Sequence, residues 1–231
     1  RDRTAELHYA VETVVKDDVI TYGHNMNKTL DRCDLLITGG QVIDGTGCPA
    51  ITADVAVQGD RIIAVGDLTV EKADAVIDAQ GKVITPGFID VHTHDDRLLL
   101  SNSEVTPKLS QGVTTVVVGN CGVSLSPWLS DRAPPPPLDL VFPDGKNGAH
   151  FSTFESYSTE LARRPAAINA LPLIGHSTLR CGAMDRLDRP ATQAEIEQMR
   201  ALLRESLAAG AGGFSTGLFY PPNKAAPAAE V

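Results

Sequence analysis

Residues 84–95 constrain this chain more than any other stretch of its sequence. A β-branched apolar run over 83–91 is broken by a Pro-Gly pair at 86–87 and ends in His92-Thr-His94. Because side chains alternate along a strand, we expect His92 and His94 to point to the same face. Two neutral imidazoles suit zinc and neighbouring transition metals. The segment therefore predicts a metal site at the end of a buried strand, with two ordinary surface histidines as the alternative.

A second strand ends in a residue that suits the same metal. Residues 113–118 form a continuous β-branched run, as expected for a strand buried on both faces, and Cys121 follows it between Gly119 and Gly122. A lone cysteine after a strand is usually a small core residue. Beside His92 and His94 on a neighbouring strand, Cys121 becomes a candidate thiolate ligand.

Strands and helices alternate after His94. We predict strands over 83–94, 113–121, 168–176 and 213–220, with helical segments over 98–110, 151–164 and from 192 to about 209. Such alternation predicts parallel βα units. The fold class is therefore α/β with about four βα units; that they are half of a (β/α)8 barrel, which needs eight units and about 250 residues, is implied by a family resemblance.

The part before the first histidine is rich in short strands. Residues 34–38, 41–44, 54–58, 61–65 and 75–78 are apolar or alternate, and glycine turns at 39–40 and 59–60 separate them. This spacing predicts a small sheet or sandwich. We divide the chain into an N-terminal extension of doubtful origin (1–32), a β-sandwich portion (33–85) and the first half of a barrel (86–231). Within the extension, residues 1–25 lack a clear continuation and are hypothesised to be upstream or mispredicted sequence.

Helix signals refine this outline. Thr192 and Glu195 form a capping box, and an apolar stripe that includes Met199 follows at helical spacing. Ser152 is the expected N-cap of the helix over 151–164. The proline-rich residues 124–150 are expected to form a long functional or mobile loop.

Composition excludes several classes of partner. The net charge of -9 argues against nucleic acid, and no apolar run approaches the length of a membrane span. The four cysteines show no CxxC spacing, and no signal peptide opens the chain. We therefore expect a cytoplasmic protein with reduced thiols and no membrane partner.

These motifs resemble the amidohydrolase superfamily, whose members are metal-dependent hydrolases on a (β/α)8 barrel. Residues 86–96 resemble its first barrel strand, where two histidines bind metal. Residues 119–124 resemble the D-aminoacylase (N-acyl-D-amino-acid deacylase) branch, in which a cysteine ligates metal. Residues 173–180 and 213–222 resemble the ends of strands 3 and 4 in that branch. The resemblance covers about residues 33–231.

The resemblance implies an enzyme that acts on C–N bonds other than peptide bonds. It implies hydrolysis of an N-acyl-D-amino acid, a small-molecule substrate, to a carboxylate and a D-amino acid. It implies one or two Zn2+ ions, with His92, His94 and Cys121 as ligands. The general base, an aspartate at the end of strand 8, is expected beyond Val231. The alternatives are a cyclic-amide hydrolase of the dihydropyrimidinase or hydantoinase kind, and a catalytically inactive fragment.

Three further residues are candidates for substrate binding. Tyr220 could hold the substrate's carboxylate or acyl group through its hydroxyl, with an ordinary packed tyrosine as the alternative. His176 could line the mouth of the active site or be a hydrogen-bonded histidine at a strand end. Arg180 suits a bidentate carboxylate clamp, although a structural ion pair is the stronger interpretation. Asp90 could support the metal ligands through a hydrogen bond.

Overall fold

The computed structural model describes residues 27–101, 104–142 and 150–231. The chain divides into two compact units, 1–87 and 88–231. The extension predicted over 1–32 falls mostly outside the described residues, but its last six residues belong to a strand. The boundary between the two units lies next to the predicted one at 85–86.

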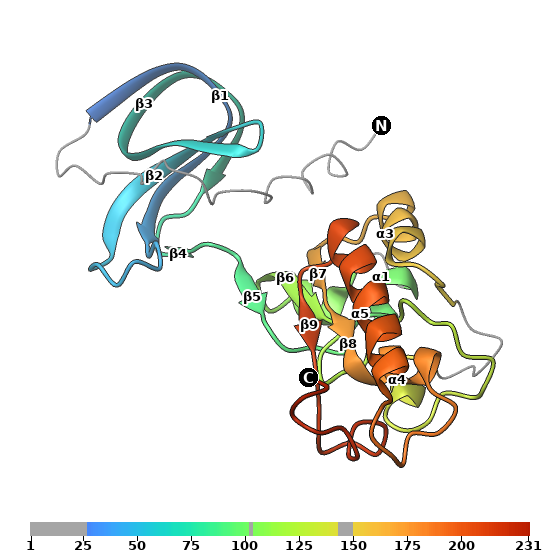
Figure 1. Ribbon diagram of the computed structural model, residues 1–231. Helices are drawn as coiled ribbons and strands as arrows, with labels where there is room; N and C mark the ends of the chain where they lie inside the picture. Colours follow the sequence, from blue (N-terminus) through green and yellow to red (C-terminus); the bar gives the residue numbers. More distant parts are fainter. Residues whose placement is uncertain (1–26, 102–103, 143–149) are drawn as a thin grey trace. The chain divides into compact units, whose positions relative to one another are not determined.

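The first unit is a mixed sheet of four strands (Figure 1). Its three longer strands each pair with the other two: β1 is parallel to β3, and β2 is antiparallel to both. The short β4 adds to β1 in parallel. The strands are β1 (Asn27–Val42), β2 (Ile51–Gln58), β3 (Arg61–Asp78) and β4 (Val83–Ile84).

Two of these strands are much longer than predicted. Residues 34–38 and 41–44 were expected as separate strands, yet β1 runs through them with a register shift between Ile37 and Gly40. Gly39 has a φ of 68°, so the glycine pair forms a bulge and not a turn. Likewise β3 joins the strands predicted over 61–65 and 75–78. The turn at 59–60 between β2 and β3 is confirmed.

The second unit contains short parallel strands. One sheet has the order β5-β6-β7, and β8 pairs with β9 in another, so the described residues form no closed barrel. The predicted spans were too long because proline, glycine and polar residues end the pairing early. The strands are β5 (Phe88–Asp90), β6 (Val113–Val118), β7 (Asn169–Pro172), β8 (Ile174–Gly175) and β9 (Phe214–Ser215).

Helices connect these strands. The connector predicted over 98–110 is two single turns, and the helix predicted from 151 begins after Thr153, whose side chain accepts from the N–H of Ser156. Thr153, not Ser152, is therefore the N-cap. The helices are α1 (Leu98–Ser101), α2 (Thr106–Leu109), the 3-10 turn η2 (Leu138–Leu140), α3 (Phe154–Arg163), α4 (His176–Ala183) and α5 (Gln193–Ala208). None of those in the described ranges is long and apolar enough to cross a membrane.

The core of the second unit depends on the segment that was predicted to be a long loop. The rings of Trp128 and Phe142 lie 4.6 Å apart between centroids, tilted by 42°, and pack with Phe154, Tyr157 and Met199. The described part of this segment is therefore a packed element of the core. Met199 is buried, which confirms its predicted core position.

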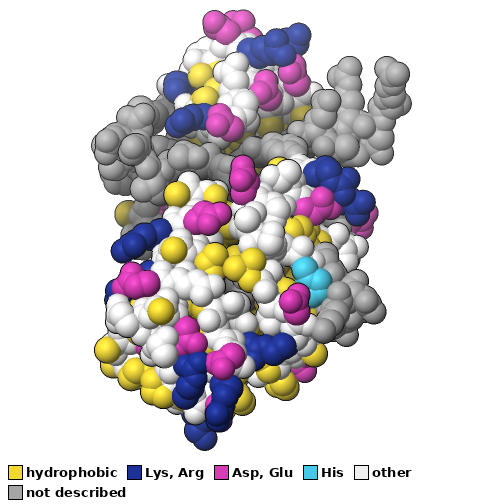
Figure 2. Space-filling model, turned by 45° about the vertical axis from the view of Figure 1, so that its right-hand side comes forward, with side chains coloured by type: hydrophobic (Ala, Val, Ile, Leu, Met, Phe, Trp, Pro, Cys, Tyr) yellow, Lys and Arg dark blue, Asp and Glu magenta, His cyan; other side chains and the backbone are white. Residues whose placement is uncertain are grey.

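The surface carries charges of both signs. On the face shown in Figure 2, acidic and basic side chains lie among one another. Among the described residues on that face, no large patch of a single sign gathers.

Candidate metal centre

The two histidines lie just beyond a strand and not within one. β5 ends at Asp90, and His92 and His94 belong to the irregular segment that follows. Their ring centroids are 5.9 Å apart and the rings are nearly perpendicular. The structure thus brings the rings together as predicted, but through a turn at the end of β5 instead of strand alternation.

Cys121 reaches the same place from β6 by an unusual backbone conformation. Its φ is 57°, in the left-handed region that residues with a Cβ seldom adopt. Gly119 lies so close to Leu173, the residue between β7 and β8, that a Cβ there would be 2.2 Å from the Leu173 carbonyl oxygen. The turn aims the Cys121 sulfur at the first histidine, with Sγ 3.0 Å from Nε2 of His92.

One ligand atom from each of His92, His94 and Cys121 lies within 4.8 Å of the other two. Two imidazole nitrogens and one thiol are a donor set that zinc accepts, and tetrahedral zinc places such atoms about 3.3–3.8 Å apart. Nε2 of His92 and Sγ of Cys121, at 3.0 Å, are slightly closer than this, and no pair exceeds 4.8 Å, so small side-chain adjustments fit the three residues to an ion. Three protein ligands leave a fourth position open for substrate.

A lysine ties together the two carboxylates that flank the histidines. Lys108, in α2, places Nζ 2.7 Å from Asp90 and 3.2 Å from Asp95. Asp90 also accepts from the backbone N–H of His92 at 3.3 Å. The hydrogen bond from Lys108 lowers the pKa of Asp90, so this carboxylate stays charged beside the histidine turn. Sequence reasoning proposed Asp90 as support but missed Lys108, since the contact forms only when α2 packs against β6, the neighbour of β5.

Burial shifts the pKa values of His94 and of the nearby Asp96 in opposite directions. Desolvation lowers the pKa of His94, and the neighbouring His92 lowers it further. A neutral imidazole is the form that binds a metal. Asp96 is 1% exposed, and burial raises its pKa to about 7.

Tyr220 lies against Cys121. Interaction with the Cys121 side chain raises the pKa of the Tyr220 hydroxyl. Gly217 fits between them: a Cβ there would lie 2.6 Å from the Cys121 carbonyl oxygen and 2.6 Å from the Tyr220 ring. Among the three residues predicted to bind substrate, Tyr220 is the one that the structure brings to the cluster.

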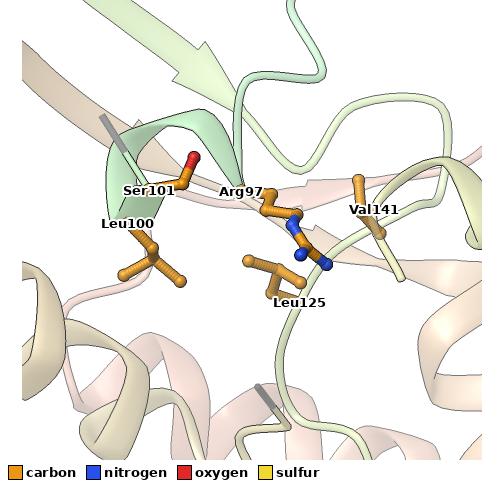
Figure 3. Close-up of a pocket in the computed structure, with 5 residues that line it drawn as sticks. All are labelled: Arg97, Leu100, Ser101, Leu125 and Val141. Carbon is orange, nitrogen blue, oxygen red and sulfur yellow. The ribbon is translucent and has the colours of Figure 1, made fainter. Parts of the chain in front are cut away.

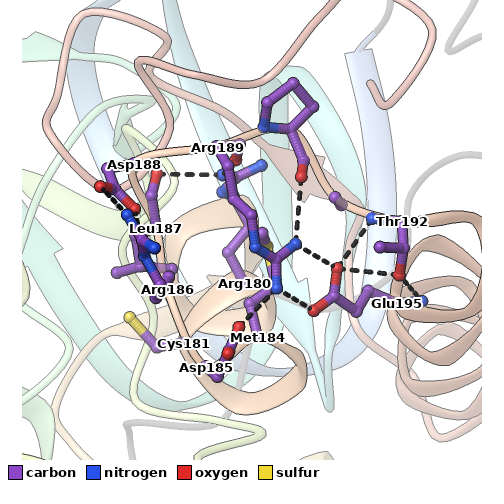
Figure 4. A network of polar contacts seen from close by, with 12 residues as sticks. Arg180, Cys181, Met184, Asp185, Arg186, Leu187, Asp188, Arg189, Thr192 and Glu195 are labelled. Carbon is purple, nitrogen blue, oxygen red and sulfur yellow. Dashed lines mark hydrogen bonds and ion pairs between the residues drawn. The ribbon is translucent and has the colours of Figure 1, made fainter.

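Arg180 and His176 are buried in α4, and their polar atoms are hydrogen-bonded to other groups of the protein. Arg180 is 0% exposed and is paired with Glu230. Its other nitrogens donate to backbone carbonyls, including those of Leu187 and Arg189 (Figure 4). His176 is 2% exposed and starts a helix, so it does not end a strand as expected. This arrangement matches the alternatives considered for both residues, a structural ion pair and a hydrogen-bonded histidine.

A separate small cavity lies beside α1. Its walls come from Arg97, Leu100, Ser101, Leu125 and Val141 (Figure 3). The guanidinium of Arg97 and the Ser101 hydroxyl are its polar groups. None of the three clustered metal-ligand candidates contributes to this lining, so the cavity and the His-His-Cys cluster are distinct features of the second unit.

An α/β unit that gathers two histidines and a cysteine after neighbouring parallel strands defines a candidate metal-dependent hydrolase. The family model for the amidohydrolase family matches residues 75–230. The chain therefore belongs to the amidohydrolase family.

Its relatives include deacylases of D-amino acids. It is 53% identical over 200 residues to an N-acyl-D-aspartate deacylase of Alcaligenes xylosoxydans xylosoxydans, covering 87% of this chain and 40% of that protein. It is 51% identical to a D-aminoacylase of the same organism, covering 86% and 40%. The chain thus spans about two-fifths of the length of these curated relatives.

Solved structures give the same similarity. A D-aminoacylase crystal structure matches with a TM-score of 0.80 and 52% identity, covering 86% of this chain and 41% of that one. An N-acyl-D-glutamate deacylase of Bordetella bronchiseptica, solved with zinc and a phosphonate mimic of the tetrahedral intermediate, matches with a TM-score of 0.77 and 43% identity, covering 87% and 41%. Another D-aminoacylase structure concerns the binuclear metal centre of that enzyme.

Proposed function

We propose that the intact protein hydrolyses the amide bond of N-acyl-D-amino acids, using zinc held by His92, His94 and Cys121. The observation that carries this proposal is the convergence of the three side chains within 4.8 Å. The similarity to N-acyl-D-aspartate deacylase and D-aminoacylase supports the choice of substrate class. The products are a carboxylate and a free D-amino acid.

The fold proposal follows from the same similarity. Residues 33–85 contribute to a β-sandwich, and residues 86–231 form the first four βα units of a (β/α)8 barrel. The parallel order β5-β6-β7, followed by the parallel pair β8-β9, supports this arrangement. In such barrels the active site gathers at the carboxyl ends of the strands, where His92, His94 and Cys121 lie.

Each residue has a proposed role in the reaction. Bound zinc supplies Lewis-acid chemistry toward the amide carbonyl. Asp90 and Lys108 hold the histidine turn in place. The Tyr220 hydroxyl is proposed to donate to the acyl oxygen or carboxylate of a bound substrate, because its ring packs near the backbone of Cys121 across Gly217. The general base is proposed to lie beyond Val231. In this proposal Arg180 and His176 no longer contact the substrate, because their polar atoms are already bound within the protein.

The alternative for these 231 residues is a metal-binding chain without catalysis, and the two-fifths coverage of the relatives favours it. The test measures zinc content and hydrolysis of N-acetyl-D-amino acids on the same preparations, for the 231-residue chain and for the intact protein. If both proteins bind zinc and only the intact protein hydrolyses the substrate, the result supports a deacylase for the intact protein and a metal-binding chain without catalysis for the 231 residues. Hydrolysis of cyclic ureides or imides alone would redirect the assignment to a cyclic-amide hydrolase.

Variants locate the metal. We expect about one zinc per 231-residue chain, lost in His92→Ala and Cys121→Ala because each removes one of three ligands. Cys48→Ser is the matched control, since this cysteine is exposed and lies in the other unit. Full zinc content in Cys121→Ala would sink the proposed ligand set.

A further inference from the structure

A buried asparagine lies between the two segments that carry the candidate metal ligands. Asn120 directly precedes Cys121 in the cysteine turn (residues 120–123), and Thr93 separates the two histidines of the histidine turn (residues 91–94). Asn120 is 7% exposed and Thr93 is 5% exposed. Because buried polar groups need hydrogen-bond partners, the partners of these two residues decide how the two turns are held.

The side-chain amide of Asn120 reaches from the cysteine turn to the histidine turn. Its nitrogen Nδ2 lies 2.8 Å from the carbonyl oxygen of Val117, in β6, and 3.3 Å from the carbonyl oxygen of Thr93. An amide nitrogen carries two hydrogens, so it can donate to both carbonyls at once. The Asn120 side chain therefore ties the backbone between the two histidines to β6.

The histidine turn has one further attachment to β6. The pairing of β5 with β6 ends at Asp90, but the N–H of Thr93 still donates to the Val117 carbonyl oxygen at 3.1 Å. Both backbone polar groups of Thr93 are thus attached to β6, the N–H directly and the carbonyl through Asn120. Without the Asn120 amide, the N–H would be the only one of these two groups still attached.

The backbone of Asn120 begins the turn that presents Cys121. Its carbonyl oxygen accepts from the N–H of Val123 at 2.9 Å, and the two residues between them, Cys121 and Gly122, have φ of 57° and 79°. Positive φ at both central positions is the requirement of a type I′ turn. The N–H of Ser177, in the first turn of α4, donates to the Gly122 carbonyl at 2.8 Å. The cysteine turn is therefore held at both of its ends.

We infer that Asn120 is a positioning residue for the proposed metal centre, because it fixes the histidine turn and the cysteine turn at the separation that one ion requires. Its side chain holds the carbonyl between the two histidines, and its backbone begins the turn of Cys121. Both amide hydrogens are directed at protein carbonyls, so Asn120 acts through the ligands. The inference deepens the proposed function and rests on it for the presence of the ion.

The test uses Co2+ in place of Zn2+, because zinc has a filled d shell and no visible spectrum. Titration of the 231-residue chain gives the cobalt affinity. The near-ultraviolet charge-transfer band of a cobalt–thiolate bond gives the share of bound cobalt that Cys121 ligates. All variants carry Cys48→Ser, which removes the exposed thiol, and Cys121→Ala supplies the baseline of the band.

Asn120→Leu keeps the branched shape of the side chain and removes both donors. We expect a cobalt affinity about fivefold lower, the factor that corresponds to one net hydrogen bond. The thiolate band per bound cobalt should also weaken, because cobalt then stays on the histidines while the cysteine turn moves away. A band of unchanged intensity per bound cobalt would overturn the inference, since a loss of stability alone leaves that ratio constant.

The same substitution in the Cys121→Ala chain separates positioning from general loosening. Cobalt then binds the two histidines alone, and the separation of the two turns no longer matters. Asn120→Leu should change this residual affinity by less than about twofold, because the interaction that couples the two sites is already lost. Equal fold-changes with and without Cys121 would reject the inference.

Ser206→Ala is the matched control. Ser206 is 2% exposed in α5, and its hydroxyl donates to the Leu202 carbonyl at 2.8 Å. The substitution therefore removes another buried side-chain donor to a backbone carbonyl of the second unit. It should lower the stability and leave both the cobalt affinity and the thiolate band unchanged. A thiolate band weakened as much as in Asn120→Leu would count against the inference.

Asn120→Ala covers the case in which leucine does not fit, because it removes the same donors without adding volume. Circular dichroism identifies the folded variants, and the thiolate band should weaken in alanine as in leucine. The two proposals fail in different ways. An unsubstituted chain without a thiolate band rejects the proposed ligand set and the inference with it, whereas a band that persists undiminished in a folded Asn120 variant rejects the positioning role alone.

Discussion

The left-handed backbone of Cys121 is a local strain located at the proposed site. Among the described residues, Val105 is the only other non-glycine residue with a positive φ. Such conformations persist where the surrounding structure fixes them, and they cluster at functional sites. Gly119 and Gly122, with φ of 76° and 79°, flank Cys121 and carry the rest of the turn. The three residues together direct the Cys121 sulfur toward His92.

The first prediction concerns Gly119. Alanine there would meet the Leu173 carbonyl oxygen at 2.2 Å and would also adopt a left-handed backbone, which alone costs about 1–2 kcal/mol. We expect Gly119→Ala to lower the free energy of unfolding by more than this and to weaken zinc binding, because the turn that aims Cys121 must shift. Urea unfolding and zinc titration measure the two effects.

Gly81→Ala is the control for that prediction. Gly81 has a similar φ of 72°, but a Cβ there would meet no atom within 4 Å, and it lies in the first unit. It should show the backbone cost without any change in zinc affinity. Equal zinc affinity in Gly119→Ala and the unsubstituted chain would contradict the role of the tight turn.

The sequence predicts the candidate metal ligands better than it predicts the residues that hold the surrounding structure through ion pairs. His92, His94 and Cys121 could be found because each follows a recognisable apolar run. Lys108 and Glu230 could not, since their partners are 18 and 50 residues away and the contacts exist only after folding. The burial of Arg180 and His176 was hidden for the same reason.

At the scale of elements, glycine and proline were the main source of error. The pair that includes Gly39 was expected to be a turn, yet neighbouring strands pair across it and make it a bulge within β1. Pro86 was placed inside one strand, although the structure assigns the residues on its two sides to β4 and β5 in separate units. Strand pairing is non-local, so periodicity alone could not distinguish these cases. The capping box at α5 is local, and its prediction is confirmed.

That capping box supports a prediction about pH. Glu195 accepts from Thr192 and binds Arg189 (Figure 4), and the hydrogen bond from Arg189 lowers its pKa from 4.5 to about 2. A carboxyl whose pKa falls on folding stabilises the fold above its unfolded pKa, and this stabilisation is lost as the pH falls through the folded value. We expect Glu195→Gln to lower the free energy of unfolding by about 1 kcal/mol at neutral pH.

The pH dependence distinguishes this ion pair from simple packing. The difference between the unsubstituted chain and Glu195→Gln should be constant above about pH 5 and should shrink from there toward pH 2. Thermal unfolding followed by circular dichroism over this range measures it. Glu197→Gln is the control, because its pair with Arg200 is exposed and should show a smaller effect. A difference that stays constant down to pH 2 would show that charge on Glu195 does not stabilise α5.

At the scale of the whole molecule, the second unit has an open sheet edge. β5 is an edge of a three-stranded sheet, and the described residues supply no further strand beside it. Apolar side chains are exposed on it, including Ile89 at 61%. Unpaired apolar edges are sites of pairing between chains. In the proposed barrel, a further βα unit would cover this edge.

We therefore predict that the isolated 231-residue chain self-associates through the β5 edge, with an oligomer fraction that grows with concentration. Ile89→Lys should weaken the association about tenfold, because it removes an apolar side chain and places a charge at the edge. Light scattering after size exclusion, over a range of concentrations, measures this. Leu140→Lys is the matched control: Leu140 is 66% exposed in the same unit but lies in η2, away from a strand edge. An equal effect of both substitutions would mean that general surface hydrophobicity, and not the open edge of β5, drives the association.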